Sequence, residues 1–126
     1  MRYLLDTNII IEAVGGSAPA VEIFEKAVRS DWVGYSSITR LELFGYPDLT
    51  SEEENALEVV IGEIEEKAVT SSVVDCAIQI RRAVRIKTPD AIIAATAMDA
   101  GAILVTRNED DFKSIDDLVV VNPWAL

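Results

Sequence analysis

The chain has 126 residues, of which 50% are apolar and 26% are charged; this balance excludes a disordered protein and indicates one folded domain over residues 1–126. It contains no histidine and one cysteine, Cys76, which excludes a Ser-His-Asp triad, paired-histidine ribonuclease chemistry and zinc sites built on histidines or several cysteines. The formal net charge of -11 argues against general nucleic-acid binding, although it permits a nucleic-acid substrate where basic residues are concentrated locally.

The first half of the sequence alternates short apolar runs with helical patterns. Asp6 ends the first apolar run, and Thr7 or Asn8 is available to cap the helix that follows. Ser36 or Ser37 is placed to cap a later helix. The elements expected here are a buried strand at 3–5, a helix after it, an amphipathic helix at about 18–30, a strand at 32–35, a helix around 38–43 and a helix that begins at 50 or 51.

The second half continues the alternation. A short strand is expected at 67–69, and Ser71 or Ser72 should cap a helix that runs to about Arg85. Pro89 at the first helical position introduces an alanine-rich helix at 90–100, and apolar strands follow at 102–105 and 118–121. This order predicts an α/β fold with a parallel sheet between helices, which places ligands beyond the carboxyl ends of the strands.

Four acidic residues, Asp6, Glu42, Asp90 and Asp111, occupy positions that can converge. Asp6 and the loop with Asp111 each follow a strand, and Asp90 begins a helix, so their carboxylates are expected at one edge of the sheet. Hard divalent cations such as Mg²⁺ prefer oxygen ligands. The arrangement predicts metal-dependent hydrolysis of phosphodiester bonds. Taken singly, each acid has a plainer reading as a helix cap, a favourable charge at a helix start or a solvated surface group.

Membrane and export signals are absent from the printed sequence. The longest apolar stretch, at about 91–98, is far shorter than the roughly 20 residues that a membrane span needs. Asp6 interrupts the apolar run at the N-terminus, so no secretory signal is formed. We therefore expect a cytoplasmic protein with no membrane association.

Four segments in this order resemble the PIN domain, and within it the VapC-like toxins of type II toxin-antitoxin systems. They are Leu4-Leu5-Asp6-Thr7-Asn8, the helix with residues 39–43, the run at 87–97, and residues 103–108 continuing through Asp111-Phe112. The resemblance covers nearly the whole chain. It implies a three-layer α/β/α PIN-like fold with a central, mainly parallel sheet, and an endoribonuclease that uses Mg²⁺ or Mn²⁺ as cofactor.

The resemblance also assigns roles to individual residues. Asp6, Glu42 and Asp90 match the metal-binding acids of the family, and Asp111 matches an acid in its final motif. Asn108 departs from the pattern, since many relatives carry aspartate there, although its amide oxygen can still bind a metal or a metal-bound water. We expect Asp6 and Asp90 to hold the principal ion, Glu42 and Asp111 to complete the site, and Thr7 and Asn108 to orient ligands or water.

Basic residues and partners complete the expectations. Four of the eleven basic residues fall within positions 81–87. Arg81 and Arg85 from this group, with Arg40 and Arg107 beside site residues, are candidate RNA contacts; their plainer reading is a solvated surface. The resemblance implies RNA as substrate, a cognate antitoxin protein and a homodimer.

Two alternatives and several details stay open at this point. The alternatives to a nuclease are a non-catalytic PIN-like module for protein contacts and a metal-dependent phosphatase of another α/β family. Such a phosphatase requires Asp at position 8, where this chain has Asn. The sequence does not reveal the RNA target, the cleavage motif, the antitoxin, the oligomeric state or whether one or two metals bind.

Overall fold

Five parallel strands form one central sheet in the order β3-β2-β1-β4-β5 in the computed structural model, which describes residues 1–125. Every neighbouring pair is parallel, with Leu4 opposite both Gly34 and Leu104 in the register. The strands are β1 (Arg2–Leu5), β2 (Trp32–Ser36), β3 (Glu65–Lys67), β4 (Ile103–Val105) and β5 (Val120–Val121).

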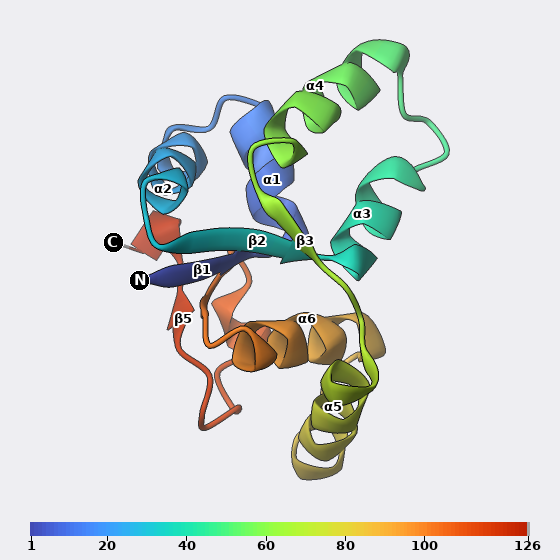
Figure 1. Ribbon diagram of the computed structural model, residues 1–126, viewed down its shortest axis with the longest axis vertical. Helices are drawn as coiled ribbons and strands as arrows, with labels where there is room; N and C mark the ends of the chain where they lie inside the picture. The colour runs from blue at the N-terminus through green and yellow to red at the C-terminus, as the bar shows by residue number, and fades with distance from the viewer. Residues whose placement is uncertain (126) are drawn as a thin grey trace.

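Helices cover both faces of this sheet, so the predicted three-layer α/β/α architecture is confirmed (Figure 1). Helices α1 to α4 lie on one face, while α5 and α6 lie on the other (Figure 1). The helices are α1 (Thr7–Val14), α2 (Ala18–Val28), α3 (Ser37–Phe44), α4 (Ser51–Ile61), α5 (Ser71–Ala83) and α6 (Thr88–Asp99), with short 3-10 helices η1 (Glu109–Asp111) and η2 (Pro123–Ala125).

Alternation along the central strand divides the core in two. Leu4 of β1 packs with α5 and α6, whereas Tyr3 and Leu5 pack with α1 to α4. Side chains of a strand point alternately to opposite faces, so one short apolar run supplies both cores. Six of the twelve residues of α6 are buried, four of them alanines, whose small side chains allow the helix to lie close to the sheet.

Several predicted helix starts are off by one residue. Asp6, not Thr7 or Asn8, is the N-cap of α1, because its carboxylate accepts a hydrogen bond from the Thr7 amide. Thr70 caps α5 in place of Ser71 or Ser72, since three hydroxyl residues in a row offer equivalent caps. Helix α6 begins at Thr88, so Pro89 occupies its second position.

Two strand positions also differ from the prediction. β3 ends at Lys67 instead of beginning there, because Glu65 and Glu66 form the edge strand despite their weak strand preference. β5 is limited to Val120 and Val121, where the expected strand was 118–121. In residues 1–125, no helix combines the length and apolar character that crossing a bilayer requires.

Candidate functional site

The order of the strands reverses between β1 and β4. The chain builds β2 and β3 on one side of β1, then crosses over and builds β4 and β5 on the other side. β1 leads into α1 on one face, while β4 leads toward Phe112, which is buried in the core on the opposite face. The carboxyl end of a parallel sheet opens at such a reversal, and ligands bind there.

Asp6 lies at this point and is only 5% exposed. Its backbone amide donates to the Val105 carbonyl at 2.9 Å, which fixes the residue to the end of β4. Its Oδ2 atom accepts hydrogen bonds from the Thr106 hydroxyl at 2.8 Å and from the Asn8 side-chain amide at 3.2 Å. The carboxylate is therefore held in one orientation by residues from both adjoining strand ends.

Glu42 approaches from the neighbouring strand end through α3. The Thr7 hydroxyl bonds to Glu42 Oε1 at 2.7 Å and to the Thr39 hydroxyl at 2.9 Å. Thr39 is fully buried, so it anchors this contact while Glu42 itself stays exposed. Thr7 thus holds the Glu42 carboxylate by a hydrogen bond.

Charge coupling joins Asp6, Glu42, Asp90 and Asp111 into one group. Burial raises the pKa of Asp6 above its ordinary value, the charges of Asp90 and Glu42 raise it further, and the hydrogen bonds from Thr106 and Thr7 oppose this. Burial also raises the pKa of Asp90, with further increases from Asp111 and Glu42 and a decrease from the Lys87 ammonium. Asp90 is therefore coupled by charge to Asp6, Glu42 and Asp111, which come from separate elements at the same edge.

Loop residues after β4 attach to the same group. Asn108 is exposed, and its backbone amide donates to the Thr106 hydroxyl at 3.0 Å. The Arg107 amide donates to Asn8 Oδ1 at 3.1 Å. The loop that leads to Asp111 is thereby held against the residues that support Asp6.

Three supporting residues received no role in the site from the sequence: Asn8, Thr39 and Thr106. Thr106 was the easiest of them to predict from the sequence, since it directly follows an apolar strand, as Asp6 does. Asn8 stands two positions from Asp6, which is a spacing that permits side-chain contact at a helix start. Thr39 gave no usable signal, because a threonine within a helix is more often a simple packing residue.

The donor chemistry of the group fits a hard divalent cation. Carboxylate, amide and hydroxyl oxygens are the ligands that Mg²⁺ and Mn²⁺ prefer, and mutual repulsion of the carboxylates favours a bound positive charge. Within residues 1–125, however, no three acidic or cysteine side chains lie close enough together to enclose an ion. To share an ion, Glu42 and Asp111 would have to change rotamers. Both side chains are exposed, which leaves room for this movement.

A depression of about 430 Å³ lies beside the acids. Its lining includes Asp90 and Asp111 together with Arg81 and Arg85, two of the candidate RNA contacts. The other two candidates are engaged elsewhere: Arg40 pairs with Glu66 at 3.0 Å, and Arg107 pairs with Glu12 at 2.9 Å while its guanidinium stacks 4.5 Å from the centre of the Trp124 ring.

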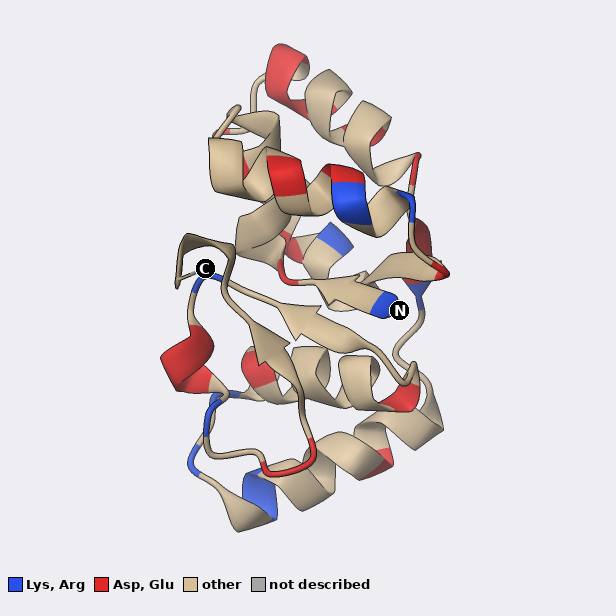
Figure 2. Cartoon of the chain, turned by 90° about the vertical axis from the view of Figure 1, so that its left-hand side faces the viewer, with Lys and Arg blue, Asp and Glu red and all other residues tan. Residues whose placement is uncertain are grey.

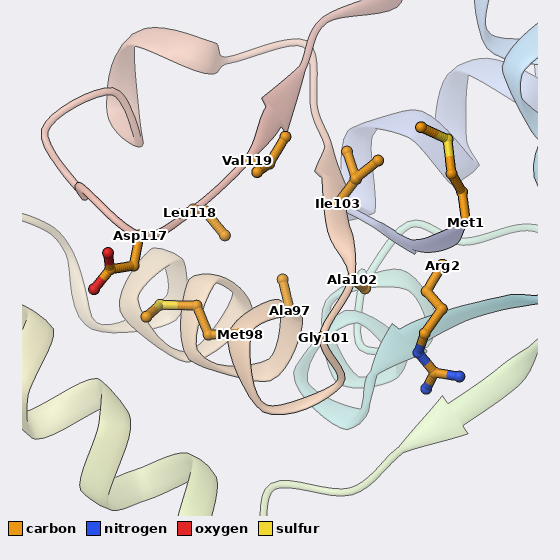
Figure 3. Close-up of a pocket in the computed structure, with 10 residues that line it drawn as sticks. All are labelled: Met1, Arg2, Ala97, Met98, Gly101, Ala102, Ile103, Asp117, Leu118 and Val119. Carbon is orange, nitrogen blue, oxygen red and sulfur yellow. The ribbon is translucent and has the colours of Figure 1, made fainter.

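A second depression, of about 480 Å³, lies at the opposite edge of the sheet (Figure 3). Arg2 and Ile103, which begin β1 and β4, contribute to its lining, as do Met98 and Val119 (Figure 3). This is the amino end of the strands, so the depression is separate from the acidic group.

Comparison with known proteins identifies the fold. The family model described as the PIN domain matches residues 3–118. Comparison with curated protein sequences gave no match.

Solved structures share this architecture over nearly their full length. A chain of a toxin-antitoxin complex from Klebsiella pneumoniae is 29% identical, with a TM-score of 0.81 and coverage of 96% of this chain and 97% of that chain. FitAcB from Neisseria gonorrhoeae is 27% identical, with a TM-score of 0.78 and coverage of 98% and 99%. VapBC2 from Rickettsia felis, bound to a promoter DNA fragment, has the same fold at 24% identity, with a TM-score of 0.85 and coverage of 97% and 98%.

Proposed function

Because the chain belongs to the PIN domain family, we propose that it is a metal-dependent endoribonuclease that acts as the toxin of a toxin-antitoxin pair. The observation that carries the proposal is the coupled group of four acids at the carboxyl edge of the sheet, where Asp6 is buried and held by Thr106, Asn8 and Thr7. The similarity to chains of toxin-antitoxin complexes supports the biological role.

Asp6, Glu42, Asp90 and Asp111 are the residues that would hold Mg²⁺ or Mn²⁺, with Asn108 as an uncharged fifth donor. A bound divalent ion activates water and stabilises charge on a phosphate during hydrolysis. Thr106 and Asn8 fix the Asp6 carboxylate, and Thr7 directs Glu42 toward the same edge. The chain contains no histidine, so carboxylates are the groups available to accept a proton near neutral pH.

Partners follow from the same family relation. We propose a cognate antitoxin protein as the regulator, because the similar solved structures include toxin-antitoxin complexes. The homodimer that the family resemblance implies is a proposal as well. A single domain over residues 1–126 and a cytoplasmic location likewise stay proposals.

The direct test is cleavage of RNA by the purified chain. Single-stranded RNA should be cut internally when Mn²⁺ or Mg²⁺ is present and should remain intact in EDTA, while DNA of the same sequence should survive. Intact RNA under all metal conditions would overturn the nuclease assignment.

One specific observation favours a second candidate, a PIN-like module that acts only through protein contacts. The acids are not assembled around an ion site in residues 1–125, and Asn108 lacks the charge that many relatives have. Mn²⁺ titration separates the two: the module binds metal weakly or not at all and leaves RNA intact. The phosphatase alternative loses its basis, because the PIN family model matches residues 3–118.

A further inference from the structure

Basic side chains share one depression with two of the site acids. Arg81, Arg85 and Lys87 line the cavity of about 430 Å³ together with Asp90 and Asp111. Figure 2 shows basic segments at the end of α5 and in the connection to α6, near the acidic start of α6. In a chain of net charge -11, this is a local concentration of positive charge beside the acidic group.

The segment that carries these cations is anchored. Val84 and Ile86 are partly buried against the core formed by α5 and α6, and the Arg81 side chain donates to the Ile86 carbonyl at 3.3 Å. Arg85 and Lys87 alternate with these anchored residues and are exposed. Their positions are therefore set by packing of the backbone on which they stand.

Arg85 and Lys87 have no direct carboxylate partner among the described residues. Over the described residues 1–125, neither takes part in an ion pair, whereas Arg40, Lys67 and Arg107 each pair with a carboxylate. Stabilisation of the C-terminal end of α5 explains Arg81 and Arg82 in its last turn. It explains Arg85 and Lys87 less well, because both lie beyond the end of the helix at Ala83.

We propose that Arg85 and Lys87, together with Arg81, form a phosphate-binding subsite that holds a backbone phosphate of single-stranded RNA next to the bond that is cleaved. The subsite rests on the proposed nuclease function and gives the RNA a path along the connection between α5 and α6. Arg40 and Arg107 are instead occupied by Glu66 and Glu12, so they are placed outside this path.

The test is RNA binding by a charge-matched pair of double variants. Each is made in the Asp6→Asn background, so that the RNA survives. Arg85→Gln with Lys87→Gln removes two cations of the subsite; Lys26→Gln with Arg29→Gln removes two exposed cations at the end of α2, on the other face of the sheet. The probe is a fluorescein-labelled, random-sequence single-stranded RNA, and its affinity is measured by anisotropy between about 50 and 200 mM KCl.

The subsite variant should bind the probe roughly 10-fold more weakly at low salt, and the slope of log affinity against log salt should become less negative by about 0.7, the value for one lost phosphate contact on a single strand. The α2 variant should match its parent. Equal effects of the two pairs, or no RNA binding by the parent, would overturn the subsite.

Cleavage assays with Mn²⁺ on an otherwise unaltered chain distinguish this proposal from the nuclease assignment. The subsite pair should raise KM several-fold and change kcat little, because it removes a contact to a phosphate that does not itself react. Normal cleavage with equal effects of both pairs would refute the subsite alone. RNA binding that depends on Arg85 and Lys87 without any cleavage would refute the nuclease alone.

Discussion

Asp6 connects the fold and the proposed chemistry in one residue. Its carboxylate caps α1, and its amide ties β1 to β4. The same carboxylate is buried among other acids, which is unfavourable for an ionised group unless a counter-charge is present. A residue that serves only as a cap does not need this position, because caps are normally satisfied at the surface.

The raised pKa values of Asp6 and Asp90 predict how stability depends on pH in the metal-free chain. Above the ordinary aspartate pKa of 3.8, the unfolded chain has released protons that Asp6 and Asp90 still hold in the folded state. The free energy of unfolding therefore falls as pH rises from 3.8 through the raised pKa values of the folded state. Asp90→Asn should reduce this decline and leave the chain at least as stable at pH 7. The free energy of unfolding is measured with urea in EDTA at several pH values. The same pH profile in Asp90→Asn and the unaltered chain would contradict the charge coupling of Asp90.

Thr106 is predicted to position Asp6. Thr106→Val removes the hydroxyl that donates to Asp6 Oδ2 and accepts from the Asn108 backbone amide, so this buried oxygen keeps only the longer bond from Asn8 at 3.2 Å. We expect a loss of about 1 to 3 kcal/mol in the free energy of unfolding, and weaker Mn²⁺-dependent cleavage. Thr106→Ser keeps the hydroxyl and should restore both properties. Equal behaviour of the two variants would show that the hydroxyl has no such role.

Asn108 is the uncharged donor of the proposed metal site, on the same loop as Asp111. Asn108→Asp adds a carboxylate beside Thr106 and should lower the Mn²⁺ concentration for half-maximal cleavage by about tenfold, because ligand charge controls affinity for hard cations. Asn55→Asp makes the same charge change on exposed α4 and should leave the Mn²⁺ dependence unaltered. An identical response of both variants would indicate a general effect of net charge.

The roles of individual residues were only partly readable from the sequence. Asp6 and Asp90 could be found because each stands at a strand or helix boundary, where the topology makes side chains converge. Thr39 and Asn8 could not be assigned, because their contacts depend on how α1 and α3 approach each other in space. The sequence likewise did not show that Arg107 is paired and Arg85 is not, because the pairing depends on tertiary contacts.

At the scale of elements, β2 requires glycine at its centre. A Cβ added to Gly34 would meet the Trp32 ring at 2.4 Å and the Glu65 carbonyl oxygen at 2.6 Å. Gly34→Ala should therefore cost about 1 to 3 kcal/mol in the free energy of unfolding, with weakened pairing of β2 and β3.

Gly15→Ala provides the control, since its added Cβ would meet ordinary contacts at 3.5 Å and its φ of -72° suits alanine. It should be neutral or slightly stabilising. Thermal melting of both variants decides the matter; equal melting temperatures would contradict the close approach of β2 and β3.

The elements themselves were largely predictable because apolar periodicity and turn residues agree along most of the chain. The break at Gly15 and Gly16, and Gly101 after α6, mark boundaries that the structure keeps. β3 was misplaced because an edge strand is held by pairing with β2, and its own residues, Glu65 and Glu66, carry no strand signal. The two-residue β5 is defined by β4 in the same way.

At the scale of the whole molecule, strand order explains why residues far apart in sequence meet. Asp6 and Thr106 are neighbours because β1 and β4 pair at the reversal of the sheet. The sequence predicted alternating strands and helices, and the PIN resemblance supplied the three-layer fold, which the structure and the family match confirm. The strand order itself depends on long-range pairing, so the sequence pattern alone did not reveal it.

The central claim is that acids from four separate elements act as one metal-dependent cleavage site. The rate of RNA cleavage as a function of Mn²⁺ concentration tests it in four proteins: the unaltered chain, Asp6→Asn, Asp90→Asn and the exposed control Asp48→Asn. We predict that Asp6→Asn and Asp90→Asn each lose at least about 100-fold in rate at every Mn²⁺ concentration, while Asp48→Asn cleaves as the unaltered chain does. Cleavage by Asp6→Asn and Asp90→Asn at the rate of the control would contradict the account.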